Sequence, residues 1–308
     1  MIEDLTFIAQ ISIKSSVAVL LATVGGIINE RSGVLNLGIE GMMLVGALAG
    51  FAAGHFTGSP LLAVAAGALA GGMLSLVHAF FTIGLRSNQV LSGLALTILG
   101  TGLANFLGRP LIGQTGVRIR QLPVPYLADI PVIGDILFNQ SPFAYAAYLL
   151  VPLAWFVLFQ TRTGLILRAV GEDARSADVA GVNVPLTRTL SVFVGGLFAG
   201  LAGTYLSLSY TPGWKETMTG GQGWIAIAMI IFCFWNPLLA FFGALLFGGL
   251  TALQFFFQAT SMDLIPSYVL KMLPYLLTIG VLVMVSASSK RRKSASPADL
   301  GVPFYREL

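Results

Sequence analysis

Charge is scarce in this chain. Only 10% of its 308 residues are charged, and it has two histidines and one cysteine. The single Cys233 excludes a disulfide framework, and no cysteine and histidine cluster has the spacing of a zinc site. No lysine follows a glycine, so the phosphate-binding loop G-x-x-x-x-G-K-[ST] of nucleotide hydrolases is missing. No Ser/His/Asp set or pair of intramembrane carboxylates can be assembled either. We therefore expect no catalytic residues, no metal and no cofactor on this chain.

Apolar residues dominate instead. They make up 56% of the chain, in several runs of about twenty residues with almost no charge. This pattern predicts an all-α integral membrane protein, a polytopic bundle of about nine transmembrane helices (eight to ten) with a broken helix near 29–42. The expected spans are 8–28, 37–55, 61–84, 90–107, 143–160, 189–210, 223–235, 238–257 and 265–286. The seventh is short, which is typical of a broken or tilted helix.

The expected organisation is a single transmembrane domain, 1–289, followed by a polar cytoplasmic tail, 290–308. We expect this tail to be poorly ordered. Glycines recur four residues apart, as at Gly46 and Gly50 or Gly196 and Gly200. Such faces let helices approach closely, either within one subunit, the favoured interpretation, or at a subunit contact.

The basic residues predict the topology. Lysine and arginine favour the cytoplasmic side, which places the tail, with four basic residues at 290–293, and the loop 162–188 inside. Counting spans backward places the N-terminus outside, where Glu3 and Asp4 argue against a cleaved signal peptide. The net charge of +4 then reflects topology and not a nucleic-acid partner. The expected extracellular link, 108–142, carries Arg109, Arg118 and Arg120 and breaks the rule.

The stretch RTGLILRAVGEDARSADVAGVN, residues 162–183, concentrates charges of both signs. Thr163 and Gly164 are expected to end the preceding span, and 169–180 to form one short amphipathic helix. One interpretation is a solvated loop that obeys the positive-inside rule. The other is a docking helix that fits a groove on a cytoplasmic partner, where mixed charges fix the register.

The stretch MTGGQG, residues 218–223, looks like a signature of ATP-hydrolysing cassettes, but the missing phosphate loop argues against that function. We interpret the glycine pair as a flexible lip on an outward-facing turn. Trp214 and Trp224 beside it are expected to be interfacial anchors.

Polar side chains at membrane depth are costly, so they mark candidate pathways. The candidates for the substrate pathway are Asn36, Glu40, His78, Asn88, Gln89, Thr97, Asn105, Trp224 and Gln254. Alternatives remain open: Asn36 and Glu40 could cap a helix, and Asn88 and Gln89 could simply be interfacial. For His78, a hydrogen-bonding role between helices is favoured over a ligand role. So few titratable groups favour a neutral solute, a nucleoside or equally a neutral sugar, over an ionic one.

The charged loop is similar to the cytoplasmic coupling loop of permease subunits of bacterial ATP-binding-cassette importers. Three further stretches agree: GGIINERSGVLNLGIEGMMLVGALAGF (25–51), SNQVLSGLALTILGTGL (87–103) and GQGWIAIAMIIFCFWNPLLAFFGALLFG (221–248). Together they resemble the superfamily of branched-chain amino acid and simple-sugar permeases, and most of all its nucleoside-importing branch. Cys233 and Phe234 depart from the pattern, because glycine and often a basic residue are expected there.

The resemblance implies partners: ATPase subunits that bind ATP and Mg²⁺, a second permease that is a different or an identical chain, an extracellular or periplasmic solute-binding protein, and membrane lipids. It implies a bacterial plasma membrane and a transport subunit that is not itself an enzyme. The residues it assigns to ATPase coupling are Arg168, Glu172, Asp173, Ala174, Arg175, Ala177, Asp178, Ala180 and Gly181. Sugar or branched-chain amino acid transport and, more remotely, a secondary carrier remain alternatives.

Overall fold

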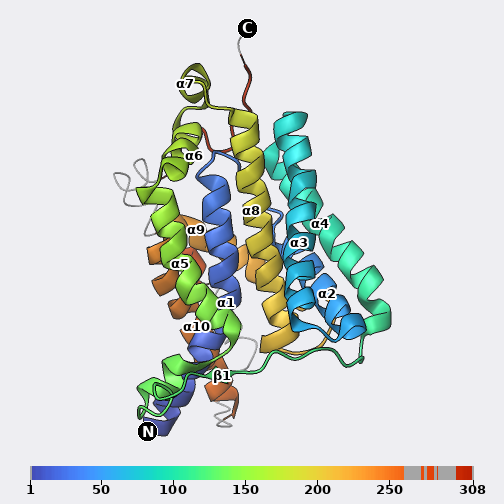
Figure 1. The fold of residues 1–308 in the computed structure, drawn as a ribbon, viewed down its shortest axis with the longest axis vertical. Helices are drawn as coiled ribbons and strands as arrows, with labels where there is room; N and C mark the ends of the chain where they lie inside the picture. The colour runs from blue at the N-terminus through green and yellow to red at the C-terminus, as the bar shows by residue number, and fades with distance from the viewer. Residues whose placement is uncertain (1, 260–271, 274–275, 281–282, 284–295, 307–308) are drawn as a thin grey trace.

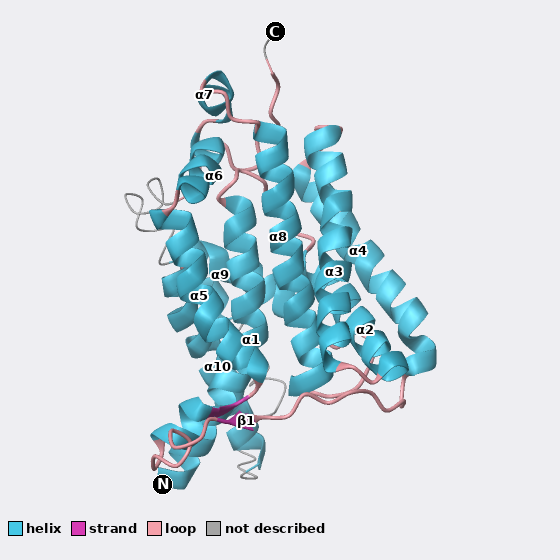
Figure 2. Ribbon diagram, viewed as in Figure 1, coloured by secondary structure: helices cyan, strands magenta, loops and turns pink. Residues whose placement is uncertain are grey.

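The computed structural model describes residues 2–259, 272–273, 276–280, 283 and 296–306 (Figure 1). The expected ninth span, 265–286, and the basic residues at 290–293 lie mostly outside the described residues. Within the described part, seven helices are long and apolar enough to cross a membrane. Among the described residues, the regular structure is helical apart from one pair of two-residue strands (Figure 2).

The long helices are α1 (Ile2–Glu30), α2 (Ile39–Thr57), α3 (Pro60–Ala79), α4 (Gln89–Gly108), α5 (Pro142–Gln160), α8 (Val184–Tyr205) and α10 (Pro237–Ala259). Two π-helical turns, Phe80–Gly84 and Leu206–Tyr210, extend α3 and α8. Each of the seven long helices, together with its π-helical turn where it has one, coincides with an expected span. The seventh expected span is indeed short, because α9 (Gln222–Phe232) has 11 residues. Two short helices, α6 (Arg162–Glu172) and α7 (Ala174–Val179), lie between α5 and α8.

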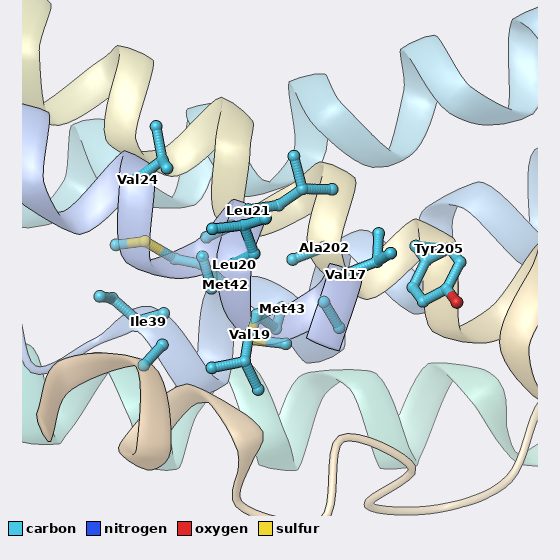
Figure 3. Close-up of a cluster of buried hydrophobic side chains, with 14 of the residues drawn as sticks. Val17, Val19, Leu20, Leu21, Val24, Ile39, Met42, Met43, Ala202 and Tyr205 are labelled. Atoms are coloured by element: carbon cyan, nitrogen blue, oxygen red, sulfur yellow. The ribbon is translucent and has the colours of Figure 1, made fainter. Parts of the chain in front are cut away.

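Helices α1 and α8 lie side by side at the centre of the bundle, with α5, α9 and α10 beside α1 and with α2 and α3 beside α8 (Figure 1). Helix α4 packs against α2 and α3, away from α8. Apolar side chains from α1, α2 and α8, among them Leu21, Met42, Met43 and Tyr205, form the buried centre (Figure 3). Helix α1 begins at one end of the bundle, and residues 296–306 lie at the other, beside α6 and α7.

The glycine faces pack α2, α3 and α8 together. A Cβ at Gly46 would lie 2.5 Å from the Cα of Gly200, and one at Gly71 would lie 2.5 Å from the carbonyl oxygen of Gly196. Contacts this close require glycine and bring helix backbones together where lipid offers no hydrophobic driving force. Packing within one subunit, the interpretation favoured from the sequence, is confirmed for these glycines.

The link between α4 and α5 runs across the end where α1 begins. It contains a 3-10 turn (Arg109–Leu111), a π-helical turn (Gly134–Phe138), and strands β1 (Leu122–Pro123) and β2 (Asn139–Gln140), which pair antiparallel. Arg118 and Arg120 line a polar pocket of about 630 Å³ there with Lys14 and Tyr210. Two of the three arginines that break the positive-inside rule therefore line a pocket, and the third, Arg109, lies in the 3-10 turn.

Candidate functional site

The corner between α5 and α6 begins the candidate coupling surface. Thr161 is extended, and its hydroxyl accepts a hydrogen bond from the amide of Gly164 at 3.2 Å. A threonine at this position caps the first turn of the following helix. The break after α5 therefore falls at Thr161, two residues before the expected position, and Thr163 and Gly164 lie inside α6.

Asp173 divides the expected single helix 169–180 into two. Its Oδ1 accepts hydrogen bonds from the amides of Arg175 and Ser176 at 3.0 Å each, and its Oδ2 from the Ser176 hydroxyl at 2.5 Å. An aspartate that caps a helix start needs extended backbone of its own, which ends α6 at Glu172. These hydrogen bonds lower the pKa of Asp173, and the bond from the Ser176 hydroxyl has a larger effect than those from the amides of Ser176 and Arg175.

The inner side of α7 is apolar. Ala174 and Ala177 are buried against Val170 of α6 and Val184 of α8, and Phe304 of the tail covers the same cluster. We call residues 162–183 the coupling stretch. Its small residues, Ala174 and Ala177, therefore let α7 pack close to the bundle. The outer side is exposed: Arg175, Ala180 and Gly181 face solvent, and Val179 at the tip is 90% exposed.

Residues 296–306, here called the tail segment, hold this corner to the bundle. Asp299 accepts a hydrogen bond from the amide of Ala174 at 2.8 Å, and Glu172 accepts one from the amide of Ala298 at 3.3 Å. The amide of Gly301 donates to the carbonyl of Gly33 at 3.0 Å, and Asp178 forms an ion pair with Arg306 at 3.0 Å. The expectation of a poorly ordered tail is wrong for these residues.

Arginines on the bundle side complete the corner. Buried Arg188 of α8 donates to the carbonyls of Ser32 and Val302. The guanidinium groups of Arg31 and Arg168 lie 5.5 and 5.1 Å from the ring centroid of Phe159. Burial lowers the pKa of Arg31. Much of the mixed charge in residues 162–183 is thus used inside the chain. Sequence reasoning missed the partners of Glu172 and Asp178 because they lie more than a hundred residues away.

The break expected near 29–42 is present between α1 and α2. Residues 34–36 are non-helical and are buried or half-buried in the bundle. His78 bonds the carbonyl of Leu35 through Nε2 and the Ser92 hydroxyl through Nδ1, both at 3.0 Å. Gln89 accepts from the amide of Leu35 at 2.7 Å. Non-helical backbone is tolerated in a membrane only where protein satisfies it, and these side chains of α3 and α4 do so.

Two further pathway candidates support the same segment. The Thr97 hydroxyl donates to the carbonyl of Leu37 at 2.9 Å, and the side chain of Asn36 accepts from the amide of Gly38 at 2.8 Å. The inter-helix role favoured for His78 is thus confirmed. Contact between these residues and a solute stays a prediction.

Glu40 joins α2 to α9. Its carboxyl group, on the first turn of α2, accepts hydrogen bonds from the Thr219 hydroxyl (2.5 Å) and the amides of Gly221 (2.9 Å) and Gly223 (2.6 Å). It therefore caps the N-terminus of α9, a different helix from its own. We call Glu40 and residues 219–223 the central junction.

The central junction corrects the interpretation of the glycine pair. Gly220 and Gly221 have φ of +56° and +85°, a left-handed turn that glycine adopts without steric cost, and the turn is held to Glu40 and is not a flexible lip. Trp214 is also not an exposed anchor, because only 4% of it is exposed. Trp224 is 39% exposed, as an interfacial residue can be.

The remaining pathway candidates are spread out. Asn88 caps α4 by accepting from the amide of Leu91 at 3.0 Å. Asn105, farther along α4, accepts from the amide of Thr217 at 3.2 Å. Gln254 is half-buried on α10, apart from the others. The structure thus gathers Asn36, Glu40, His78, Gln89 and Thr97 near the start of α2. Asn88 is next to Gln89 in the chain, and Trp224 is next to Gly223, which donates to Glu40, whereas Asn105 and Gln254 lie elsewhere.

The turn between α9 and α10 contains polar contacts that the sequence did not predict. Trp235 donates through Nε1 to Glu30 at 2.7 Å, and Arg31 donates to the Trp235 carbonyl at 3.1 Å. Phe234 and Trp235 both have φ of +52°, which favours glycine. The departure noted at Cys233 and Phe234 thus lies in a strained turn held by the end of α1.

Comparison with known proteins agrees with this architecture. Residues 7–282 match the family described as branched-chain amino acid transport system, permease component. A protein of Haloferax volcanii, provisionally named as the glucose ABC transporter permease TsgC13, is 40% identical over 96% of this chain and 97% of its own length. The nucleoside ABC transporter permease NupC of Lactococcus lactis is 35% identical over 94% of each chain. The guanosine ABC transporter permease NupQ of Bacillus subtilis is 33% identical over 99% of this chain and 98% of its own. No solved structure matches.

Proposed function

The chain belongs to the family of branched-chain amino acid transport system permease components, and on that basis we propose that it forms the solute pathway of an ATP-binding-cassette importer for nucleosides. It is the membrane-spanning permease subunit of such an importer and is not an enzyme. ATP and Mg²⁺ are bound by partner ATPase subunits. A solute-binding protein outside the membrane delivers the solute, and a second, different permease chain completes the pathway.

The observation that carries the coupling role is the corner of α6 and α7. Its inner side is fixed to the start of α8 through buried alanines and to Gly33, just after α1, through the tail segment, and its outer tip is exposed. ATPase subunits bind this tip from the cytoplasm. When they bind ATP they push the corner, and the bundle switches from inward-open to outward-open. Release of ADP and phosphate resets it. The N-terminus of the chain then lies outside the plasma membrane and the tail inside.

The use of charge inside the bundle supports a neutral solute. The carboxyl group of Glu40 is occupied by three donors of this chain, and that of Glu30 accepts from Trp235. Carboxyl groups committed in this way are poor partners for an ionic solute. A nucleoside, with hydroxyl groups and a flat base, needs only neutral polar and aromatic groups to guide it. The names of two relatives, NupC and NupQ, point the same way.

A neutral sugar is the second candidate, because the relative TsgC13 is provisionally named as a glucose permease. Competition separates the two. Cells that express the whole transporter should take up labelled guanosine, and excess unlabelled nucleosides should block this uptake while glucose, ribose and leucine do not. Block by glucose alone would replace the nucleoside proposal with the sugar one.

The coupling role is tested by removing residues 169–181. Uptake should be abolished while the protein stays in the membrane. Because the deletion also removes buried contacts, Val179→Asp is the finer variant, since Val179 is 90% exposed at the tip of α7. Phe56→Asp, 76% exposed at the opposite end of the bundle, is the matched control. Undiminished uptake in both coupling variants, or transport by this chain alone without ATP, would contradict the proposal.

A further inference from the structure

A second pocket lies beside the corner formed by α6 and α7, residues 162–179, which we call the coupling corner. It has a volume of about 440 Å³ and sits between the turn after α3, the start of α8 and the tail segment. Its size falls within the roughly 300–1,000 Å³ of small-molecule sites. The lining residues that the argument uses are Arg86, Asp178, Arg188, Phe304 and Arg306.

The charge of this pocket is unbalanced. Three arginines line it, and Asp178 is the one carboxylate among the lining residues. Arg306, whose side chain is 70% exposed, pairs with Asp178. Arg86 lies with its Cζ 4.8 Å from the centroid of the Tyr305 ring, and it holds a left-handed backbone with φ of +55°. Arg86 is thus left without a carboxylate in the pocket, whereas Arg188 has the carboxylate of Asp299 near it, outside the pocket lining.

Arg188 contributes positive charge to the pocket wall. It is only 2% exposed, and its Nε and Nη1 donate to the carbonyls of Ser32 and Val302. Its Nη2 is enclosed by the chain beside Gly33. The donors that a ligand in the pocket can reach are therefore those of Arg86, which is exposed, and Arg306, whose side chain is 70% exposed.

The depth of the pocket favours a particular anion. Gly84 ends one candidate membrane span two residues before Arg86, and Val184 begins another four residues before Arg188. The pocket therefore lies at the boundary between the hydrocarbon core and water, at the depth of the phosphate groups of the lipids.

We propose that this pocket binds a phosphate-bearing anion, supplied by an anionic phospholipid headgroup or by free phosphate. Planar guanidinium groups suit phosphate oxygens because they donate paired, charge-assisted hydrogen bonds. Basic pockets between membrane helices on the cytoplasmic side bind anionic headgroups in this way. Because the tail segment forms one wall, the bound anion also holds this segment against the coupling corner.

The lipid source is tested with the full-length chain in nanodiscs of phosphatidylcholine with a minor share of phosphatidylglycerol. Native mass spectrometry counts the phosphatidylglycerol molecules that remain bound. Arg86→Gln and Arg306→Gln should each reduce retention about ten-fold, the effect of one charge-assisted contact. Asp178→Asn removes the competing carboxylate and should increase it. Arg118→Gln, a basic residue in the pocket at the opposite end, is the matched control.

The free source is tested in nanodiscs of phosphatidylcholine alone. Inorganic phosphate should raise the unfolding temperature above that in chloride of equal ionic strength, and Arg86→Gln should remove this increase. A response in the lipid arm alone identifies a headgroup, and a response in both arms shows that phosphate itself suffices. If neither arm depends on Arg86, or if Arg118→Gln loses as much as Arg86→Gln, the proposal is wrong.

Discussion

The central junction and the coupling corner both depend on acidic side chains, but they use them differently. Glu40 is 7% exposed, and all three of its hydrogen bonds satisfy one turn of α9. Glu172, Asp173 and Asp178 lie at the surface, and each satisfies a different piece of nearby chain. Where lipid surrounds the protein, water cannot replace a lost partner, and at the corner it can. The same chemical group should therefore matter greatly in one place and little in the other.

The largest effect is expected from Glu40→Ala. It leaves the Thr219 hydroxyl and the amides of Gly221 and Gly223 without an acceptor, at a cost of about 1–3 kcal/mol for each unsatisfied donor. The variant should lose several kcal/mol of stability and most of its uptake. The unfolding temperature in detergent and the amount of protein in the membrane measure this.

Glu40→Gln refines the comparison, because it keeps one acceptor oxygen and should lose less than Glu40→Ala. Glu172→Ala is the control at the corner and should unfold at the temperature of the unsubstituted chain. If Glu172→Ala and Glu40→Ala destabilise the protein equally, the contrast between the two regions is wrong.

The two regions also differ in what the sequence could predict. Helix positions followed from apolar runs, and the break before α2 from Asn36, Gly38 and Glu40 within an apolar stretch. That Glu40 would cap α9 could not be predicted, because it lies 179 residues from Thr219 and the pairing depends on how the start of α2 meets the start of α9. A carboxylate near a helix start indicates a cap, but not which helix it caps.

At the corner, the sequence located the stretch and its charges but not their partners. Asp173 was read as one charge in a continuous helix, although aspartate is also a strong cap and could have indicated the break. The tail was judged by its polarity alone. Asp299 and Arg306 pack against the coupling stretch because their partners are polar too, a pairing that hydrophobic periodicity does not detect.

The second prediction concerns Asp173→Ala, which removes the cap of α7. The effect should be local: faster hydrogen exchange at Arg175 and Ser176 and reduced uptake, with no change in the unfolding temperature of the bundle. Because hydrogen bonds lower the pKa of Asp173, its contribution is present above the ordinary pKa of 3.8 and is lost as the pH falls through the lowered value. Between pH 6 and 8, roughly, this cap should therefore be independent of pH. Asp173→Asn should preserve protection, and equal exchange in Asp173→Ala and the unsubstituted chain would show that the cap is dispensable.

The smallest effect is expected from Asp178→Asn, which breaks the ion pair with Arg306. The Arg306 side chain is 70% exposed and that of Asp178 is 17% exposed, so water still solvates the guanidinium group. Ion pairs at the surface contribute about 0–1 kcal/mol because water and salt screen them. Asparagine also keeps an oxygen that can accept from the Arg306 guanidinium group. The unfolding temperature should match that of the unsubstituted chain at high salt and fall only slightly below it at low salt. A loss as large as that of Glu40→Gln, unchanged by salt, would mean that this pair is shielded from water like the central junction, and the contrast between the two regions would then lie in their partners and not in their solvent.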